Sequence, residues 1–85
     1  RYGELDIVAR DTDGVLVFVE VKSYKLGSLL DPVLSITPKK IKKILRTVRY
    51  YQLCFDVADV PSRIDVMIMQ NGACRDHLKG AIYVV

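Results

Sequence analysis

The sequence predicts one α/β domain with a mixed sheet, in the element order β-β-α-β-β. Three observations lead to this fold class. Two runs of apolar and β-branched residues, 3–10 and 15–23, flank a short turn; a stretch of helical periodicity follows; and two further strand-like runs flank Asn71-Gly72. Because 85 residues are enough for one domain and no more, residues 1–85 are expected to form a single unit.

The first two strands are expected to form a hairpin whose register follows from its turn. Residues 11–14 have the sequence DTDG, and a three-residue loop would place the glycine in the left-handed conformation. That loop sets Asp6 opposite Glu20 and Glu4 opposite Lys22. Both pairs would then lie at the end of the hairpin far from the turn.

Alternation along the strands divides the hairpin into two faces. One face is apolar near the turn and charged at the far end, and it comprises Glu4, Asp6, Val8, Phe18, Glu20 and Lys22. The other face is apolar and comprises Leu5, Ile7, Ala9, Val17, Val19 and Val21. The pattern predicts a strand pair that is buried on both faces and has a polar cleft at one edge.

A connection and then an amphipathic helix follow the hairpin. Residues 24–36 contain glycine and proline and are expected to be a connection with a short helical turn. Thr37 is a good N-cap and Pro38 suits the first helical position, so the helix should run from there to about Leu53. Its apolar stripe is Ile41, Ile44, Leu45, Val48 and Gln52, and its basic arc is Lys39, Lys40, Lys42, Lys43, Arg46 and Arg49.

The chain is expected to end in a second hairpin. Residues 63–70 (RIDVMIMQ) form a strand, Asn71-Gly72 is a tight-turn sequence, and the last strand lies within residues 73–85 with a break at Gly80. Asp65 is interpreted as a structural hydrogen-bonding residue and His77 as a surface or hydrogen-bonded residue rather than a ligand.

Composition and cysteine usage narrow the cellular setting. No apolar run approaches the length of a membrane span and no signal peptide is visible, so we expect a cytoplasmic protein without a membrane partner. Cys54 and Cys74 lack the spacing of a zinc site and are interpreted as reduced, half-buried cytosolic thiols.

The basic arc of the helix predicts contact with nucleic acid. The formal charge of +3 is modest, but the helix carries almost no acidic residues that could pair with its cations. Lys39, Lys40, Lys43 and Arg46 are therefore predicted to contact a phosphate backbone. An ordinary solvated helix face is the alternative. Tyr50 and Tyr51 could stack on bases, although at least one should pack in the core.

The pairing of Asp6 with Glu20 predicts a cation site. Like charges on opposed strand residues repel, and apolar walls such as Phe18 strengthen the repulsion. Either one carboxyl stays protonated or a cation lies between the two, and Lys22 can neutralise only part of the charge. A hard divalent cation such as Mg²⁺ suits one or two carboxylates. A solvated surface ion pair between Glu20 and Lys22 is the alternative.

The same residues carry a resemblance to a known family. The stretch GELDIVARD…GVLVFVEVKS resembles the GEIDLIARD…LVFVEVKT pattern of the YraN-like family of uncharacterised bacterial proteins, which have a restriction-endonuclease-like fold. SITPKKIKKILRTVRYY is similar to that family's VTPRK helix, and RIDVMIM is similar to its RFDVVAI strand. Behind this family stands the PD-(D/E)XK nuclease superfamily, which includes archaeal Holliday junction resolvases.

The resemblance implies a site and a reaction. The superfamily's Asp corresponds to Asp6, its Glu-x-Lys to Glu20-Val21-Lys22, and the backbone carbonyl of Val21 becomes a further metal ligand. The implied activity is Mg²⁺-dependent hydrolysis of DNA phosphodiesters, with Mn²⁺ as an alternative metal and branched or structured DNA as the substrate class. The family's N-terminal helix precedes this region and is missing here, so the domain is expected to be N-terminally incomplete. Residues 34–36 also depart from the family's Glu-Ala-Val.

Three functions remain open from the sequence. The first is an endonuclease in which Asp6 and Glu20 hold the metal and Lys22 serves the attacking water. The second is a nucleic-acid-binding module that keeps the fold without turnover. The third is a structural or protein-interaction domain in which a second chain replaces the missing N-terminal segment. Because a flank of the sheet is left uncovered, we expect either a homo-oligomer or a further segment upstream.

Overall fold

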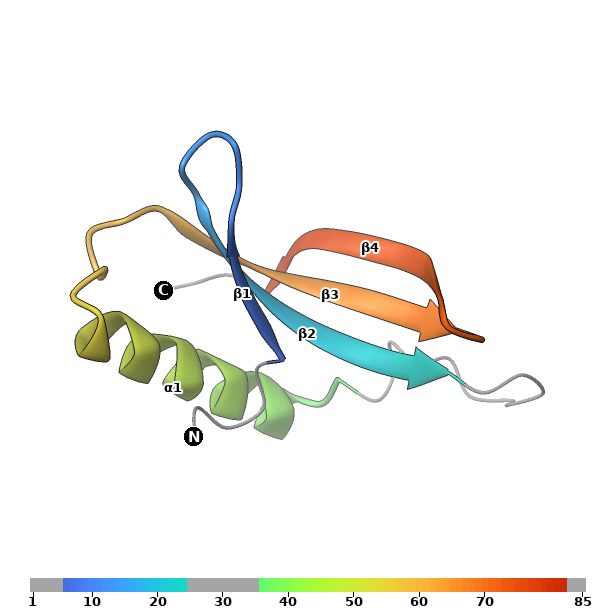
Figure 1. Cartoon of the computed structure of the whole chain (residues 1–85). Helices are drawn as coiled ribbons and strands as arrows, with labels where there is room; N and C mark the ends of the chain where they lie inside the picture. The colour runs from blue at the N-terminus through green and yellow to red at the C-terminus, as the bar shows by residue number, and fades with distance from the viewer. Residues whose placement is uncertain (1–5, 25–35, 83–85) are drawn as a thin grey trace.

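A computed structural model describes residues 6–24 and 36–82 of the chain. In these ranges a four-stranded sheet, in the order β1-β2-β3-β4, has a helix against one face (Figure 1). The elements are β1 (Ile7–Arg10), β2 (Leu16–Tyr24), α1 (Pro38–Cys54), β3 (Ser62–Gln70) and β4 (Ala73–Ile82). This confirms the predicted order and agrees with a restriction-endonuclease-like fold. The predicted strand residues 3–5, including Glu4, and most of the predicted connection lie outside the described residues.

The β1–β2 hairpin has the predicted register. Ile7 lies opposite Val19 and Arg10 opposite Leu16, in an antiparallel pair that sets Asp6 across from Glu20. Gly14 has a φ of +86°, the left-handed conformation that the turn required. The turn sequence therefore determines which carboxylates meet at the far end of the hairpin.

β2 and β3 form the buried centre of the sheet. They run parallel, with Glu20 beside Val66, and α1 connects them as the crossover that a parallel pair needs. Residues 16–20 of β2 are all buried. β1 is different, because Ile7 and Val8 are 46% and 36% exposed. The prediction that both strands are buried on both faces is thus wrong for β1, which among the described residues is an edge strand paired with β2 alone.

α1 begins and packs as predicted. The Thr37 hydroxyl accepts a hydrogen bond from the Lys40 N–H at 3.2 Å, and Pro38 is the first helical residue. The buried cluster under the helix consists of Leu16, Phe18, Ile44, Val48, Ile64, Val66, Ile68 and Ile82. Tyr51 packs edge-on against Phe18, with ring centroids 5.3 Å apart, which confirms that one tyrosine belongs to the core. Among the described residues, no helix is long and apolar enough to cross a bilayer.

The β3–β4 hairpin turns at Asn71-Gly72, as predicted. Both residues have positive φ, +53° and +77°, which is the signature of a type I′ turn. Gly80 does not end the last strand: β4 continues to Ile82 through a register shift opposite β3, and Gly80 adopts a φ of +62°. A bulge at Gly80 therefore replaces the predicted break.

The packing of α1 gives a first testable expectation. Ile44 is fully buried beneath the sheet, whereas Leu53 on the same helix is 78% exposed. We expect Ile44→Ala to lower the free energy of unfolding by about 3 kcal/mol, because it leaves a cavity in the core. Leu53→Ala should change it by less than about 0.5 kcal/mol. Urea unfolding followed by circular dichroism measures both, and equal losses would contradict this packing.

Candidate active site

Glu20 and Lys22 project from β2 toward α1. Alternation along the strand puts both on the face that Phe18 shares with the helix, and the core holds Glu20 at 3% exposure. The Lys22 ammonium lies 3.4 Å from Glu20 Oε1. The predicted Glu-x-Lys pair is thus a contact at the edge of the core rather than a solvated surface pair.

Asp6 reaches the same place from the start of β1. Its backbone N–H donates to the carbonyl of Val19 at 3.2 Å, and its Oδ2 accepts a hydrogen bond from the N–H of Val21 at 2.9 Å. The N–H and C=O of one strand residue point to the same neighbouring strand, so the Val21 carbonyl is directed toward the Asp6 side. Asp6, Glu20, Val21 and Lys22 therefore converge at one end of the hairpin.

Glu20 is the electrostatically unusual residue of this group. Burial raises the pKa of its carboxyl above the ordinary value, and the charge of Asp6 acts in the same direction, against Lys22 and Lys40. Its Oε2 atom is buried and has no hydrogen-bond partner among the described residues. A buried carboxylate oxygen without a partner is costly, so the site favours a positively charged group next to it.

Two lysines share the other oxygen of Glu20. Lys40 from the first turn of α1 places its ammonium 3.6 Å from Oε1, the atom that Lys22 also contacts. Burial lowers the pKa of Lys22, and the neighbouring Lys40 ammonium lowers it further. The two strands and the helix thus bring two acids and two cations into one cluster.

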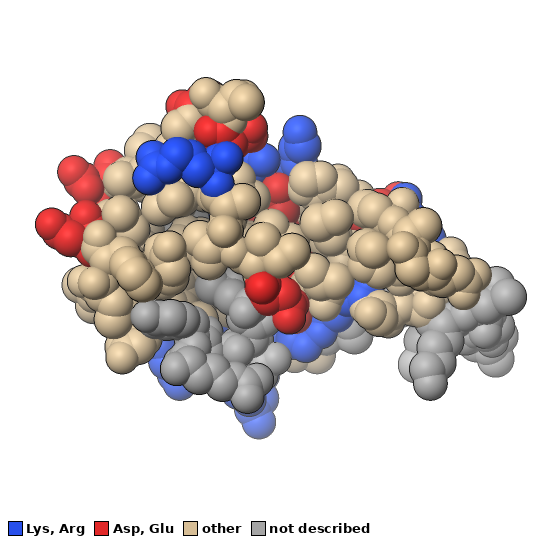
Figure 2. Space-filling view, viewed as in Figure 1, with Lys and Arg blue, Asp and Glu red and all other residues tan. Residues whose placement is uncertain are grey.

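The basic arc of α1 divides into two parts. Lys39, Lys43 and Arg46 are exposed, as a phosphate-contacting surface requires, whereas Lys40 turns inward to Glu20. Thr37, Lys39, Lys40 and Lys43 line a hollow of about 260 Å³ beside the cluster. Figure 2 shows basic side chains along the lower edge of the molecule, the side on which α1 runs in Figure 1.

The cluster fits a magnesium-type ion better than zinc. The described residues contain no group of three or more His, Cys, Asp and Glu side chains that could hold a metal. Zinc needs three or four such ligands, whereas Mg²⁺ is held by one or two carboxylates and keeps several waters. Asp6, the unpartnered oxygen of Glu20 and the Val21 carbonyl meet the second requirement.

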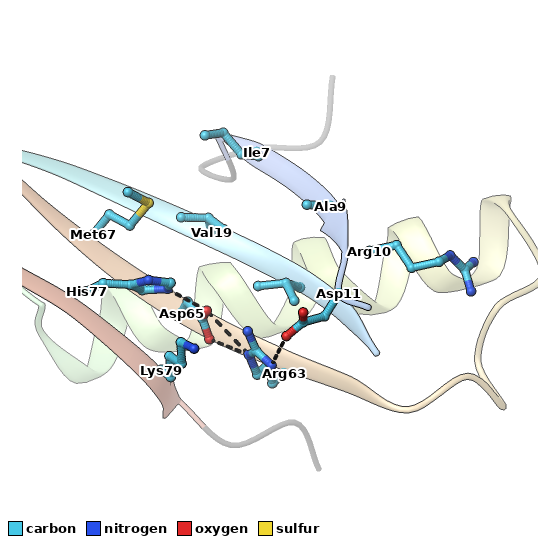
Figure 3. Close-up of a pocket in the computed structure, with 11 residues that line it drawn as sticks. Ile7, Ala9, Arg10, Asp11, Val19, Arg63, Asp65, Met67, His77 and Lys79 are labelled. Atoms are coloured by element: carbon cyan, nitrogen blue, oxygen red, sulfur yellow. Dashed lines mark hydrogen bonds and ion pairs between the residues drawn. The ribbon is translucent and has the colours of Figure 1, made fainter. Parts of the chain in front are cut away.

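A second carboxylate, Asp65, is buried on the opposite face of the sheet. It is 0% exposed and accepts hydrogen bonds from Arg63 Nε at 3.0 Å, from the Gly80 N–H at 2.9 Å and from His77 Nε2 at 2.8 Å (Figure 3). Arg63 also reaches Asp11 in the first turn at 2.9 Å. The predictions that Asp65 makes structural hydrogen bonds and that His77 is a surface or hydrogen-bonded residue are confirmed.

The Asp65 network differs from the Glu20 cluster because both carboxylate oxygens of Asp65 accept hydrogen bonds. Burial acts to raise the pKa of Asp65, but the Gly80 N–H, Arg63 and His77 together outweigh it and hold that pKa below the ordinary value. The network borders an open hollow of about 390 Å³ with an apolar floor that includes Val17, Val19 and Met67. Every partner of Asp65 stabilises its charged form, so we assign it a structural role.

Sequence reasoning missed the inward position of Lys40 and the extent of the Asp65 network. Lys40 lies four residues before the buried Ile44, which places both on one helix face and was a usable signal. No comparable signal pointed to Gly80 as a hydrogen-bond donor, because only the bulge in β4 turns its N–H toward β3. Cys54 and Cys74 are free, as predicted, but both are exposed, so the prediction that they are half-buried is wrong.

Comparison with known proteins places this geometry in a family. Residues 1–69 match the uncharacterised protein family UPF0102. The chain belongs to this family. The UPF0102 protein of Helicobacter hepaticus is 39% identical over 74 residues, which cover 87% of this chain and 63% of that protein. The relative from Helicobacter pylori strain Shi470 is 45% identical over 74 residues, 85% of this chain and 59% of its own.

A UPF0102 protein from another genus also matches this chain. The UPF0102 protein of Persephonella marina is 37% identical over 81 residues, covering 95% of this chain and 68% of that protein. The YraN-like resemblance of the hairpin and helix motifs is thereby confirmed. The chain spans about three fifths of the length of the Helicobacter UPF0102 relatives.

The Asp65 network should make the stability of this UPF0102 chain depend on pH. We expect Asp65→Ala to lower the free energy of unfolding by about 3 kcal/mol near neutral pH, because it removes the charged acceptor of hydrogen bonds from Arg63, His77 and the Gly80 N–H. Since the pKa of Asp65 is lowered on folding, its stabilisation is present above the ordinary Asp pKa and is lost as pH falls through the lower, folded value. Urea unfolding between neutral and acidic pH should therefore show the two proteins converging in acid.

The matched control for this test is Asp76→Ala. Asp76 is 48% exposed and pairs with Arg75 at 3.3 Å on the surface of β4. Such a pair contributes less than about 1 kcal/mol, so this variant should resemble the parent chain at every pH. A pH-independent difference between the parent and Asp65→Ala would contradict the proposed charge state.

Proposed function

We propose that this domain is a Mg²⁺-dependent endonuclease that hydrolyses phosphodiesters in DNA. The observation that carries the proposal is the buried carboxylate of Glu20, with one oxygen unpartnered, facing Asp6 and contacting Lys22. A purely structural carboxylate would be expected to have its acceptors satisfied, as Asp65 does. The motif resemblance supports the same reaction, and fold alone would not.

Each residue of the cluster has a defined task in this reaction. The carboxylates of Asp6 and Glu20 and the Val21 carbonyl would hold the ion, which would supply charge stabilisation at the phosphate and lower the pKa of the attacking water. Lys22 would orient that water or donate to the developing charge, since its ammonium is fixed by Glu20 at the border of the site. Burial beneath α1 strengthens these interactions by excluding solvent.

The exposed part of the basic arc would hold the substrate. Lys39, Lys43 and Arg46 lie along one side of α1, and the hollow between Thr37 and Lys43 adjoins Lys40 at the cluster. Contacts of this kind bind the sugar-phosphate backbone without reading base sequence. The substrate class that follows is DNA recognised by its shape, and the superfamily resemblance favours branched or structured DNA.

Cleavage assays test the proposed residues. We expect Asp6→Asn, Glu20→Gln and Lys22→Met each to lower the cleavage rate by at least about 100-fold, because each removes a charge from the reacting centre. Chelation of divalent ions should abolish product, and added Mg²⁺ or Mn²⁺ should restore it. Labelled duplex and four-way junction DNA serve as substrates, with products separated on denaturing gels.

The control variant is Asp59→Asn, which removes an exposed acid outside the cluster. It should cleave at the parent rate. DNA binding without any Mg²⁺-dependent product, unchanged by Glu20→Gln, would refute the hydrolytic proposal and identify a binding module that has lost turnover.

Salt dependence tests the basic arc separately from catalysis. A plot of log K for DNA binding against log salt concentration has a negative slope, and its magnitude decreases by about 0.9 for each phosphate contact that is removed. We expect Lys43→Met to reduce the slope by about that amount, whereas Lys79→Met should leave it unchanged, because Lys79 lies beside Asp65 on the other face. Fluorescence anisotropy between low and moderate salt measures the slopes, and equal effects of the two variants would exclude α1 as the binding surface.

A further inference from the structure

We propose that Lys40 is an internal counter-ion of Glu20 which the metal displaces, so that its ammonium moves onto the DNA phosphate when the site is loaded. The proposal rests on the function proposed above and adds a positioning residue that the Asp and Glu-x-Lys motifs do not contain. It assigns Lys40 to the reacting centre, apart from the exposed phosphate-contacting residues of α1.

Both lysines that contact Glu20 contact the same one of its two carboxylate oxygens. Lys22 and Lys40 lie 3.4 Å and 3.6 Å from the same atom, Oε1, while Oε2 is buried and has no partner among the described residues. Two ammonium groups on one oxygen repel each other. The two lysines compensate the charge of Glu20 at Oε1. They leave Oε2 without a partner, so a metal ion could bind that oxygen.

The start of α1 fixes the position of Lys40. Its backbone N–H is held by the Thr37 hydroxyl at 3.2 Å, and Ile44, one turn further, is fully buried against the sheet. The Lys40 side chain is 25% exposed, between the buried face of the helix and its basic arc. From this position a flexible side chain can reach either Glu20 or solvent.

A divalent ion near Glu20 would change the balance of charge. Two positive charges added beside two ammonium groups raise the repulsion on both of these cations. Lys22 is anchored on β2 within two residues of Glu20, whereas Lys40 borders the hollow lined by Thr37, Lys39 and Lys43. A non-bridging phosphate oxygen in that hollow would be the new partner of the Lys40 ammonium.

Metal titration without DNA tests the exchange. Mn²⁺ binding, measured by calorimetry and by line broadening at Glu20 and Asp6, is compared in the parent chain and in Lys40→Met, Lys40→Arg and Lys42→Met. Lys42 is exposed on the same helix, so its removal controls for net charge. We expect Lys40→Met to bind Mn²⁺ at least about threefold more tightly, because a competing cation is gone. Lys40→Arg should restore parent affinity, and Lys42→Met should stay near it.

A double-mutant cycle in chelator tests the starting contact without metal. Lys40→Met should lower the urea midpoint of the parent chain but have little effect in a Glu20→Gln background. Additive effects would overturn the ion pair and the proposal with it. Parent Mn²⁺ binding that Asp6→Asn abolishes, but that Lys40→Met does not tighten, would overturn the exchange and leave the hydrolytic function standing. If the parent chain binds no Mn²⁺, both fail.

Discussion

The placement of Glu20 under α1 is the constraint on which the candidate site depends. The parallel β2–β3 pair needs a helical crossover, and that helix buries the face of β2 on which Glu20 lies. A carboxylate in that position is taken out of water, which raises its pKa and strengthens its attraction for cations. The convergence of Lys22, Lys40 and the Asp6 carboxylate on this point follows from the same burial.

The two buried carboxylates of the sheet differ in how far hydrogen bonds offset the free-energy cost of burying their charge. Asp65 lies beside Val19 on the face away from α1, and its hydrogen bonds to Arg63, His77 and Gly80 hold its pKa down. Glu20 keeps an unpartnered oxygen within the described part of the chain, and its pKa is raised. Within one small sheet, the saturated carboxylate ties strands together, and the unsaturated one has capacity left for a ligand.

α1 connects the core of the domain to its proposed substrate. Its buried face supplies Ile44 and Val48 to the cluster under the sheet, and its exposed face carries the basic arc. Lys40 lies at the border between the two faces and contacts Glu20. One helix therefore stabilises the fold, closes the candidate site and presents cations to solvent, which couples the packing of the domain to the geometry of the site.

The sequence by itself determined the element order, the hairpin register and the helix start, because these depend on local signals. Thr37-Pro38 marks the helix start, Asn71-Gly72 marks a type I′ turn, and the DTDG turn sets Asp6 against Glu20. Tertiary structure alone decided the rest. The exposure of β1, the bulge that turns the Gly80 N–H to Asp65 and the inward position of Lys40 depend on which elements pack together, and periodicity along one segment does not encode distances to another.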